Sequence, residues 1–180
     1  MGKILVMTEG PNELGLMNLL LDEEKLVFTR DDLLDLRPFH ARQLTSPHLL
    51  PSLTHYHGDL SVYRIGDALN DKLKIPAELL SRIEEERKFC TKPELEILLV
   101  IAENRAKDFE KEKSKKSPKE FCKEHLRFQG KRYDNSTEFF LNYFSGRIEF
   151  LVHTIKEYKR THKKHKRDEE FLADLLNPSA

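Results

Sequence analysis

The start of the chain most constrains what it can fold into, because an apolar run, a tight turn and a helical repeat follow one another directly. Residues 3–8 (KILVMT) are nearly all apolar, which is typical of a strand buried on both faces of a parallel sheet. Residues 9–12 (EGPN) turn the chain, and apolar side chains then recur at helical spacing over 12–24. A strand followed at once by a helix is the unit from which α/β sheets are built.

Strands and helices continue to alternate along the first part of the chain, and helices dominate the last part. We expect strands over 33–39, 60–65 and 88–90, and helices over 45–54, 77–86 and from Pro93 to about residue 111. Two or three further helices are expected over 118–126, 136–144 and 147–165, followed by a short amphipathic tail over 168–176. This order predicts an α/β fold with a Rossmann-like, mostly parallel sheet flanked by helices, divided into an α/β core (1–115) and a helical, basic C-terminal extension (116–180) packed on the core.

Several classes of protein are excluded by composition and by missing motifs. No stretch approaches the roughly 20 apolar residues of a membrane span, and the first apolar run is too short for a signal peptide, so we expect a cytoplasmic protein without membrane contact. Cys90 and Cys122 make neither a disulfide framework nor a metal box, which predicts reduced thiols. The chain lacks the phosphate-loop, GxGxxG and nucleophile-elbow patterns, which argues against an NTPase or a dinucleotide enzyme.

The charges of the chain balance overall but are unevenly distributed. Residues 1–60 carry nine acids against five Lys and Arg, whereas 105–132 carry eleven bases against five acids, and 156–167 carry seven bases against one acid. A basic run of this kind is either a solvated helix face or a footprint for phosphate, and we take nucleic acid as the expected partner. The candidate nucleic-acid contacts are Arg42, Lys156, Lys159, Arg160, Lys163 and Lys164.

Two acids directly follow predicted strands, and each adjoins a glycine. Glu9 and Asp67 are therefore expected at the carboxyl edge of the sheet, where α/β proteins bind their ligands. Of Glu94 and Glu96, which begin the next apolar helix, Glu96 is expected to face inward. Glu13 suits the dipole of its own helix. Carboxylates that converge from separate elements are typical of Mg²⁺ sites that act on phosphate.

Three short segments resemble motifs of a known family. Residues 8–13 (TEGPNE) resemble the first motif of Toprim-fold proteins, a hydrophobic strand that ends in Glu-Gly before a helix. This motif reads close to (V)EGxTE in the overcoming-lysogenization-defect (OLD) nucleases and the RloB-like bacterial defence proteins. Residues 64–67 (RIGD), with Asn70 and Asp71, resemble the second motif, which is usually Asp-x-Asp. Residues 90–99 (CTKPELEILL) are similar to the RloB-type stretch in which Pro-x-Phe-Glu opens an apolar helix.

The resemblance implies a Toprim-like core and assigns roles to particular acids. Glu9 takes the metal-binding and acid/base position, Asp67 the first metal-binding Asp, and Glu96 the late Glu. The family's second Asp falls on Leu69, which cannot bind a metal ion. The resemblance therefore implies that Asn70 or Asp71 replaces this ligand.

The activity that the resemblance implies is phosphodiester cleavage with Mg²⁺ or Mn²⁺. The expected substrate is nucleic acid, DNA ahead of RNA, in host defence or DNA processing. Lys159 is the candidate catalytic cation, because a lysine near the acids would stabilise charge on the phosphate. The larger OLD enzymes carry an ATPase on the same chain, so an ATPase partner in trans is expected here.

Two other functions stay open at this point. Leu69 favours a non-catalytic Toprim-like adaptor that binds nucleic acid or protein. A third interpretation is a phage-encoded inhibitor or structural factor that shares only the α/β pattern. The sequence also leaves the oligomeric state open, a homo-oligomer included.

Overall fold

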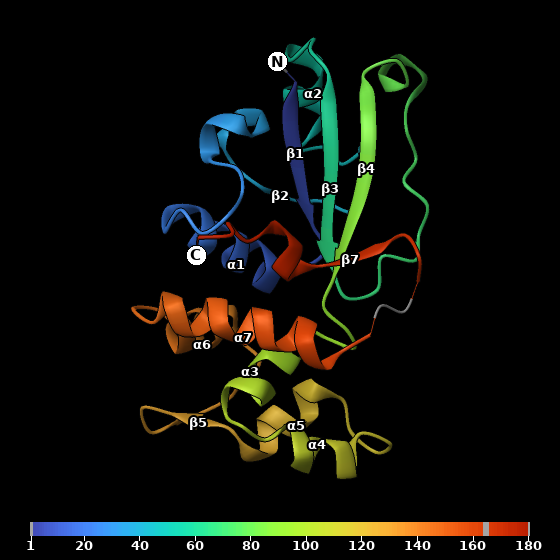
Figure 1. Ribbon diagram of the computed structural model, residues 1–180. Coiled ribbons are helices and arrows are strands. Elements are labelled where there is room, and N and C mark those ends of the chain that lie inside the picture. The colour runs from blue at the N-terminus through green and yellow to red at the C-terminus, as the bar shows by residue number, and fades with distance from the viewer. Residues whose placement is uncertain (1, 164–165, 180) are drawn as a thin grey trace.

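The computed structural model describes residues 2–163 and 166–179 (Figure 1). The strands are β1 (Lys3–Thr8), β2 (Phe39–His40), β3 (Leu60–Gly66), β4 (Ile83–Cys90), β5 (Arg127–Phe128), β6 (Lys131–Arg132) and β7 (Glu169–Phe171). The α-helices are α1 (Pro11–Asp22), α2 (Leu50–His55), α3 (Ile97–Ala102), α4 (Ala106–Glu112), α5 (Pro118–His125), α6 (Thr137–Phe144) and α7 (Ile148–Thr161). Short 3₁₀ turns are η1 (Arg30–Asp32), η2 (Leu34–Leu36), η3 (Ala77–Leu79) and η4 (Leu172–Leu175).

In the described part of the chain, the central sheet contains five parallel strands in the order β2-β1-β3-β4-β7. β1 pairs with β3 along its whole length, from Lys3 opposite Leu60 to Thr8 opposite Ile65. The predicted α/β fold with a Rossmann-like parallel sheet is therefore confirmed. The strand order reverses at β1, since β2 lies on one side and β3 on the other. Such a switch point is where open α/β sheets bind ligands.

Side chains of β1 and β3 alternate between two hydrophobic layers, as the strand period of two requires. Val6 and Ile65 face a cluster that also contains side chains of α1, α3, α6 and α7. Leu5 and Val62 face a second cluster, which includes Leu53 of α2. Burial on both faces explains why residues 3–8 read as a continuous apolar run.

The helices α3 to α7 gather at the edge of the sheet where β1 and β3 end (Figure 1). One hydrophobic cluster runs without interruption from Val6 in the sheet to Phe140 of α6 and Leu151 of α7. These helices therefore cover the carboxyl ends of the strands, and side chains at those ends lie between two parts of the fold.

The predicted helix over 77–86 is wrong. The turn η3 is followed directly by β4, which pairs with β3 from Leu60 opposite Ile83 to Gly66 opposite Cys90. The letters IEEERK favour a helix locally, but cross-strand contacts override that preference. Arg87 lies over the Tyr63 ring of β3 at 5.2 Å and donates a 2.8 Å hydrogen bond to Glu170 of β7.

The amphipathic segment 168–176 is not a tail outside the sheet, because β7 joins the sheet beside β4 and η4 follows it. The end of the predicted C-terminal extension thus belongs to the α/β sheet. Over 33–39 the structure has η2 and only the two-residue β2. The long helix predicted from Pro93 is divided into α3 and α4 at Asn104, whose φ of 55° cannot continue a right-handed helix.

Both cysteines are free, as the sequence predicts, and the structure shows that both are buried. Burial raises the pKa of the Cys90 thiol to about 11, so this group stays protonated and unreactive at neutral pH. Among the described residues, none of the helices combines the length and the apolar character that a bilayer crossing requires.

We predict that β7 is a structural part of the core. Phe171 is 8% exposed and packs edge-on against Tyr158, with ring centroids 5.9 Å apart. Phe171→Ala should lower the free energy of unfolding by about 3 kcal/mol, since it leaves a cavity. Leu80→Ala is the control, because Leu80 is 61% exposed and its loss should cost under about 0.5 kcal/mol. Urea unfolding followed by circular dichroism would contradict the prediction if both variants behaved alike.

Candidate metal centre

A cavity of about 280 Å³ opens at the carboxyl ends of β1 and β3. Four acids and two bases line it, and they come from separate segments of the chain. The acids are Glu9, Glu13, Asp67 and Glu96, and the bases are Arg42 and Lys119. We call this cavity the acidic pocket. Its remaining lining residues are Gly10, Pro11, Asn12, Leu95, Asn135 and Thr137.

Glu9 is held over the end of β3 by backbone hydrogen bonds. Its Oε2 accepts from the N–H groups of Asp67 and Ala68, each at 3.2 Å. Its Oε1 lies 3.3 Å from the guanidinium of Arg42, which follows β2. Gly66 is required beneath this side chain, because a Cβ at that position would lie only 2.8 Å from Glu9 Cβ.

Glu13 enters the acidic pocket from the first turn of α1. Its side chain is folded back over Gly10, where an added Cβ would lie 2.6 Å from Glu13 Oε2. Glu13 is only 8% exposed. It is therefore a buried acid of the pocket as well as a first-turn charge, and its role in the helix dipole alone does not explain its position.

Glu96 is the most enclosed of the four acids, at 3% exposure. Its Oε1 accepts a 2.8 Å hydrogen bond from the Tyr133 hydroxyl and a longer one, 3.4 Å, from the Asn12 amide. The Lys119 ammonium lies 4.0 Å from the same oxygen. Glu94 points elsewhere and accepts from the backbone N–H of Lys119 at 3.0 Å, so Glu96 is the inward-facing acid of the pair.

Burial and mutual repulsion raise the pKa values of two of these acids. Desolvation raises the pKa of Glu13 to about 7, and the charges of Asp67, Glu96 and Glu9 add to it, against a hydrogen bond from its own backbone. Desolvation also raises the pKa of Asp67 to about 6, with the charge of Glu9 as the next cause. The acidic pocket thus holds more negative charge than its own bases neutralise.

The donor set of the acidic pocket fits a hard, hydrated cation. All four acids offer oxygen, which Mg²⁺ and Mn²⁺ prefer. Among the described residues, only Glu112, Glu124 and His125 bring three ligand atoms within 4.8 Å of one another, so the pocket acids do not form a closed cage. Mg²⁺ needs no such cage, because it keeps several waters and takes one or two carboxylates.

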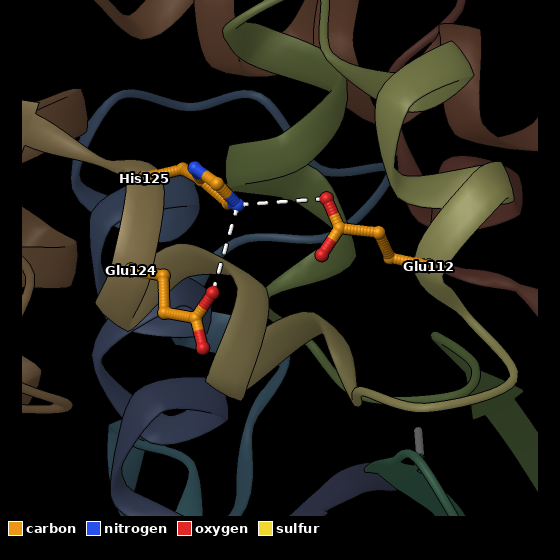
Figure 2. A group of neighbouring side chains, drawn as sticks. All are labelled: Glu112, Glu124 and His125. Atoms are coloured by element: carbon orange, nitrogen blue, oxygen red, sulfur yellow. Dashed lines mark ion pairs between the residues drawn. The ribbon is translucent and has the colours of Figure 1, made fainter.

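The group formed by Glu112, Glu124 and His125 is better explained as a salt-bridge network (Figure 2). The Lys116 ammonium lies 2.7 Å from Glu112 and also contacts Glu124. His125 Nε2 is farther away, at 3.6 Å from Glu112 and 3.8 Å from Glu124. A lysine already neutralises these partly exposed carboxylates, and the group lies outside the acidic pocket.

The proposed replacement ligand, Asp71, is not positioned for metal binding in the acidic pocket. Its carboxylate accepts from Arg64 at 3.0 Å and from Gln43 at 2.7 Å. Arg64 is itself 2% exposed and also pairs with Glu86 at 2.9 Å. Asp71 therefore fastens the loop that follows β3 and does not line the acidic pocket, and Leu69 is buried in the same loop.

The basic residues of α7 are directed elsewhere. Lys159 pairs with Asp174 of η4 and Arg160 pairs with Glu157 on its own helix, and the structure does not place the predicted catalytic Lys159 in the lining of the acidic pocket. Lys156 is likewise absent from the lining of the acidic pocket, Lys163 lines other cavities, and Lys164 falls outside the described residues. Arg42 is the predicted nucleic-acid contact that does line the pocket.

Sequence reasoning missed Lys119, Tyr133 and Asn12 as parts of this site. Lys119 and Tyr133 come from segments that reach the strand ends only through tertiary packing, and no local pattern marks them. Asn12 could have been found, because it follows the Glu-Gly turn directly and its amide nitrogen reaches Glu96.

Comparison of the chain with protein-family models, with curated proteins and with solved structures found no match in any of the three.

We predict that the stability of the metal-free protein falls as pH rises from about 4 to about 7, because Glu13 and Asp67 have raised pKa values of about 7 and about 6. A carboxyl with a raised pKa keeps its proton in the folded protein at pH values where the unfolded chain has already lost it. Its contribution to stability is therefore complete below the pKa of the unfolded chain, and it is lost as the pH rises through the pKa of the folded protein. Glu13→Gln should remove part of this slope and stabilise the protein at pH 8 by at most about 3 kcal/mol. Urea unfolding at several pH values measures the slope of stability against pH and the effect of Glu13→Gln on that slope.

The matched control for this experiment is Glu138→Gln, which changes an exposed acid in the first turn of α6. The free energy of unfolding of this variant should depend on pH in the same way as that of the wild type. An unchanged slope in Glu13→Gln would show that Glu13 does not titrate with a raised pKa.

We also predict that Gly66→Ala displaces the Glu9 carboxylate, because the new methyl group would overlap it. The pKa of Asp67 should then fall from about 6 toward its usual range, since the charge of Glu9 helps to raise it. Carboxyl carbon NMR titration measures this value. Gly15→Ala is the control, because its methyl group meets Leu141 at 2.8 Å, away from the acids. An Asp67 pKa unchanged in Gly66→Ala would contradict the arrangement.

Proposed function

We propose that the chain is a nuclease that cleaves phosphodiester bonds of nucleic acid with the help of a divalent cation, Mg²⁺ or Mn²⁺, bound in the acidic pocket. The observation that carries this proposal is the convergence of Glu9, Glu13, Asp67 and Glu96 beside Arg42 and Lys119 at the switch point of a parallel sheet. The resemblance of residues 8–13 and 64–67 to Toprim motifs points in the same direction.

The raised pKa values support cation binding. Acids that repel one another enough to hold protons near neutral pH would be relieved by a cation. Glu9 and Asp67, which directly follow the neighbouring strands β1 and β3, would hold it, with Glu96 and Glu13 beside them. When bound, such a cation neutralises charge on the phosphate and lowers the pKa of a coordinated water.

The other residues of the acidic pocket have chemical roles that suit this reaction. Arg42 pairs with Glu9 at 3.3 Å, but its side chain is 67% exposed and its guanidinium has further N–H groups that can donate to a phosphate at the mouth of the pocket. Lys119, whose ammonium lies 4.0 Å from Glu96, offers a second positive charge. Glu13 lines the same pocket, where its carboxylate can accept a proton from an attacking water.

A second candidate is a non-catalytic adaptor that keeps the fold and binds nucleic acid. Two observations favour it: Leu69 stands where the family's second Asp is expected, and Asp71 pairs with Arg64. An adaptor would bind nucleic acid without cutting it. An ATPase partner in trans is compatible with either function.

The experiment is a cleavage assay on single-stranded and duplex DNA and RNA with Mg²⁺ or Mn²⁺. Glu9→Gln and Asp67→Asn should each reduce the rate by at least about 100-fold, the size typical of losing a group that stabilises the transition state. Asp71→Asn is the matched control, since it removes an acid from the same loop but outside the pocket, and its rate should stay within about fivefold.

Each outcome decides between the candidates. Cleavage that survives both pocket substitutions would place the activity elsewhere and overturn the proposal. Binding of nucleic acid by the wild type, without cleavage under any metal condition, would favour the adaptor.

A further inference from the structure

A second hollow surface lies next to the acidic pocket, between α4, the α4–α5 loop and the end of α7. It consists of two adjoining cavities of about 650 and 720 Å³, which share Glu110 and His162 in their lining. We call it the basic groove. The lining residues that matter here are Lys107, Lys115, Lys163, Pro93, Ile101 and Ala106.

The basic groove carries positive charge that is available for a ligand. Lys107, Lys115 and Lys163 are exposed, and no ion pair found among residues 2–163 and 166–179 engages their ammonium groups. They come from α4, from the loop after it and from the segment after α7. By contrast, Lys159 and Arg160, the strongest candidates from sequence, are already paired.

The basic groove and the acidic pocket share two of their walls. In one segment, Pro93 and Glu94 line the groove, and the next residues, Leu95 and Glu96, line the pocket. In the other, residues 117 and 118 line the groove and residue 119 lines the pocket. The hydrogen bond from the Lys119 N–H to Glu94, 3.0 Å long, joins these walls. The groove and the pocket therefore adjoin each other across these walls, and a chain-like ligand would pass over their rim to contact both.

We propose that the basic groove holds the sugar–phosphate backbone of a single nucleic-acid strand that leads into the acidic pocket. This inference rests on the proposed function and adds the form of the substrate and its path. Lysines at the rim match the phosphates of such a strand. Pro93, Ile101 and Ala106 line the same groove with side chains that are exposed or partly exposed, and the base faces of a single strand can cover apolar surface of this kind. A duplex has its base faces stacked inside and would leave this apolar surface of the groove uncovered.

The test measures binding of a fluorescein-labelled oligothymidylate by fluorescence anisotropy, with Ca²⁺ in place of Mg²⁺. The double variant Lys107→Glu/Lys115→Glu should weaken binding by about tenfold or more, because two phosphate contacts are lost. The slope of log affinity against log salt should fall by about 1.4, since each contact to a single strand contributes about 0.7.

The matched control is Lys111→Glu/Lys123→Glu. These lysines lie on α4 and α5, are exposed and are absent from the lining of the groove, and the change in net charge is the same. The control should bind within about twofold of the wild type. Equal weakening in both variants would show a general charge effect and overturn the proposal. So would a duplex that binds more tightly than the single strand and depends equally on the groove lysines. Urea midpoints confirm that both variants fold.

Failure of this inference and failure of the proposed function give different results. If the acidic pocket is not catalytic, Glu9→Gln and the wild type will both bind the strand without cleaving it, and the groove variant will still bind more weakly. If the pocket is catalytic but the path is wrong, the groove variant will bind and cleave the single strand as the wild type does, whereas Glu9→Gln will not cleave it.

Discussion

The hydrogen bonds from the Asp67 and Ala68 backbone to Glu9 tie the end of β1 to the end of β3, and the acidic pocket depends on them. They exist because β1 and β3 are neighbours in one parallel sheet and because Gly66 leaves room for the Glu9 side chain. Once these two carboxylates lie together, every further acid that α1 or the α3 segment brings increases the repulsion. The helices that cover this edge prevent water from relieving it.

The central acids of the pocket could be predicted from sequence because their positions follow from local rules. Glu9 and Asp67 come directly after strands that are recognisable by apolar content, and parallel strands place their carboxyl ends at one edge. Glu96 has apolar neighbours one turn later, which predicts an inward side chain. The burial of Glu13 and the position of Lys119 in the pocket depend on how α5 and α6 pack over the strand ends. No local sequence pattern predicts that packing.

The errors in the fold have a common physical origin in long-range strand pairing. The letters of β4 are strong helix formers, and β7 is only three residues long, so neither shows the alternation of a typical strand. Arg87 stabilises both, because it lies on Tyr63 of β3 and binds Glu170 of β7. The position of Asp71 also depends on a contact that the local sequence does not reveal. Its partner, Arg64, occupies a buried position on β3, where the sequence alone would predict an apolar side chain.

The position of β7 in the chain has a consequence for synthesis in the cell. β7 follows α7, so the ribosome releases β4 and all the intervening helices before the strand that covers β4 exists. During that interval, residues 88–90 present unpaired N–H and C=O groups along an open edge, and such an edge can recruit a strand from another molecule. Nascent chains, and fragments that stop before residue 169, are therefore the forms of this protein most exposed to edge-to-edge aggregation.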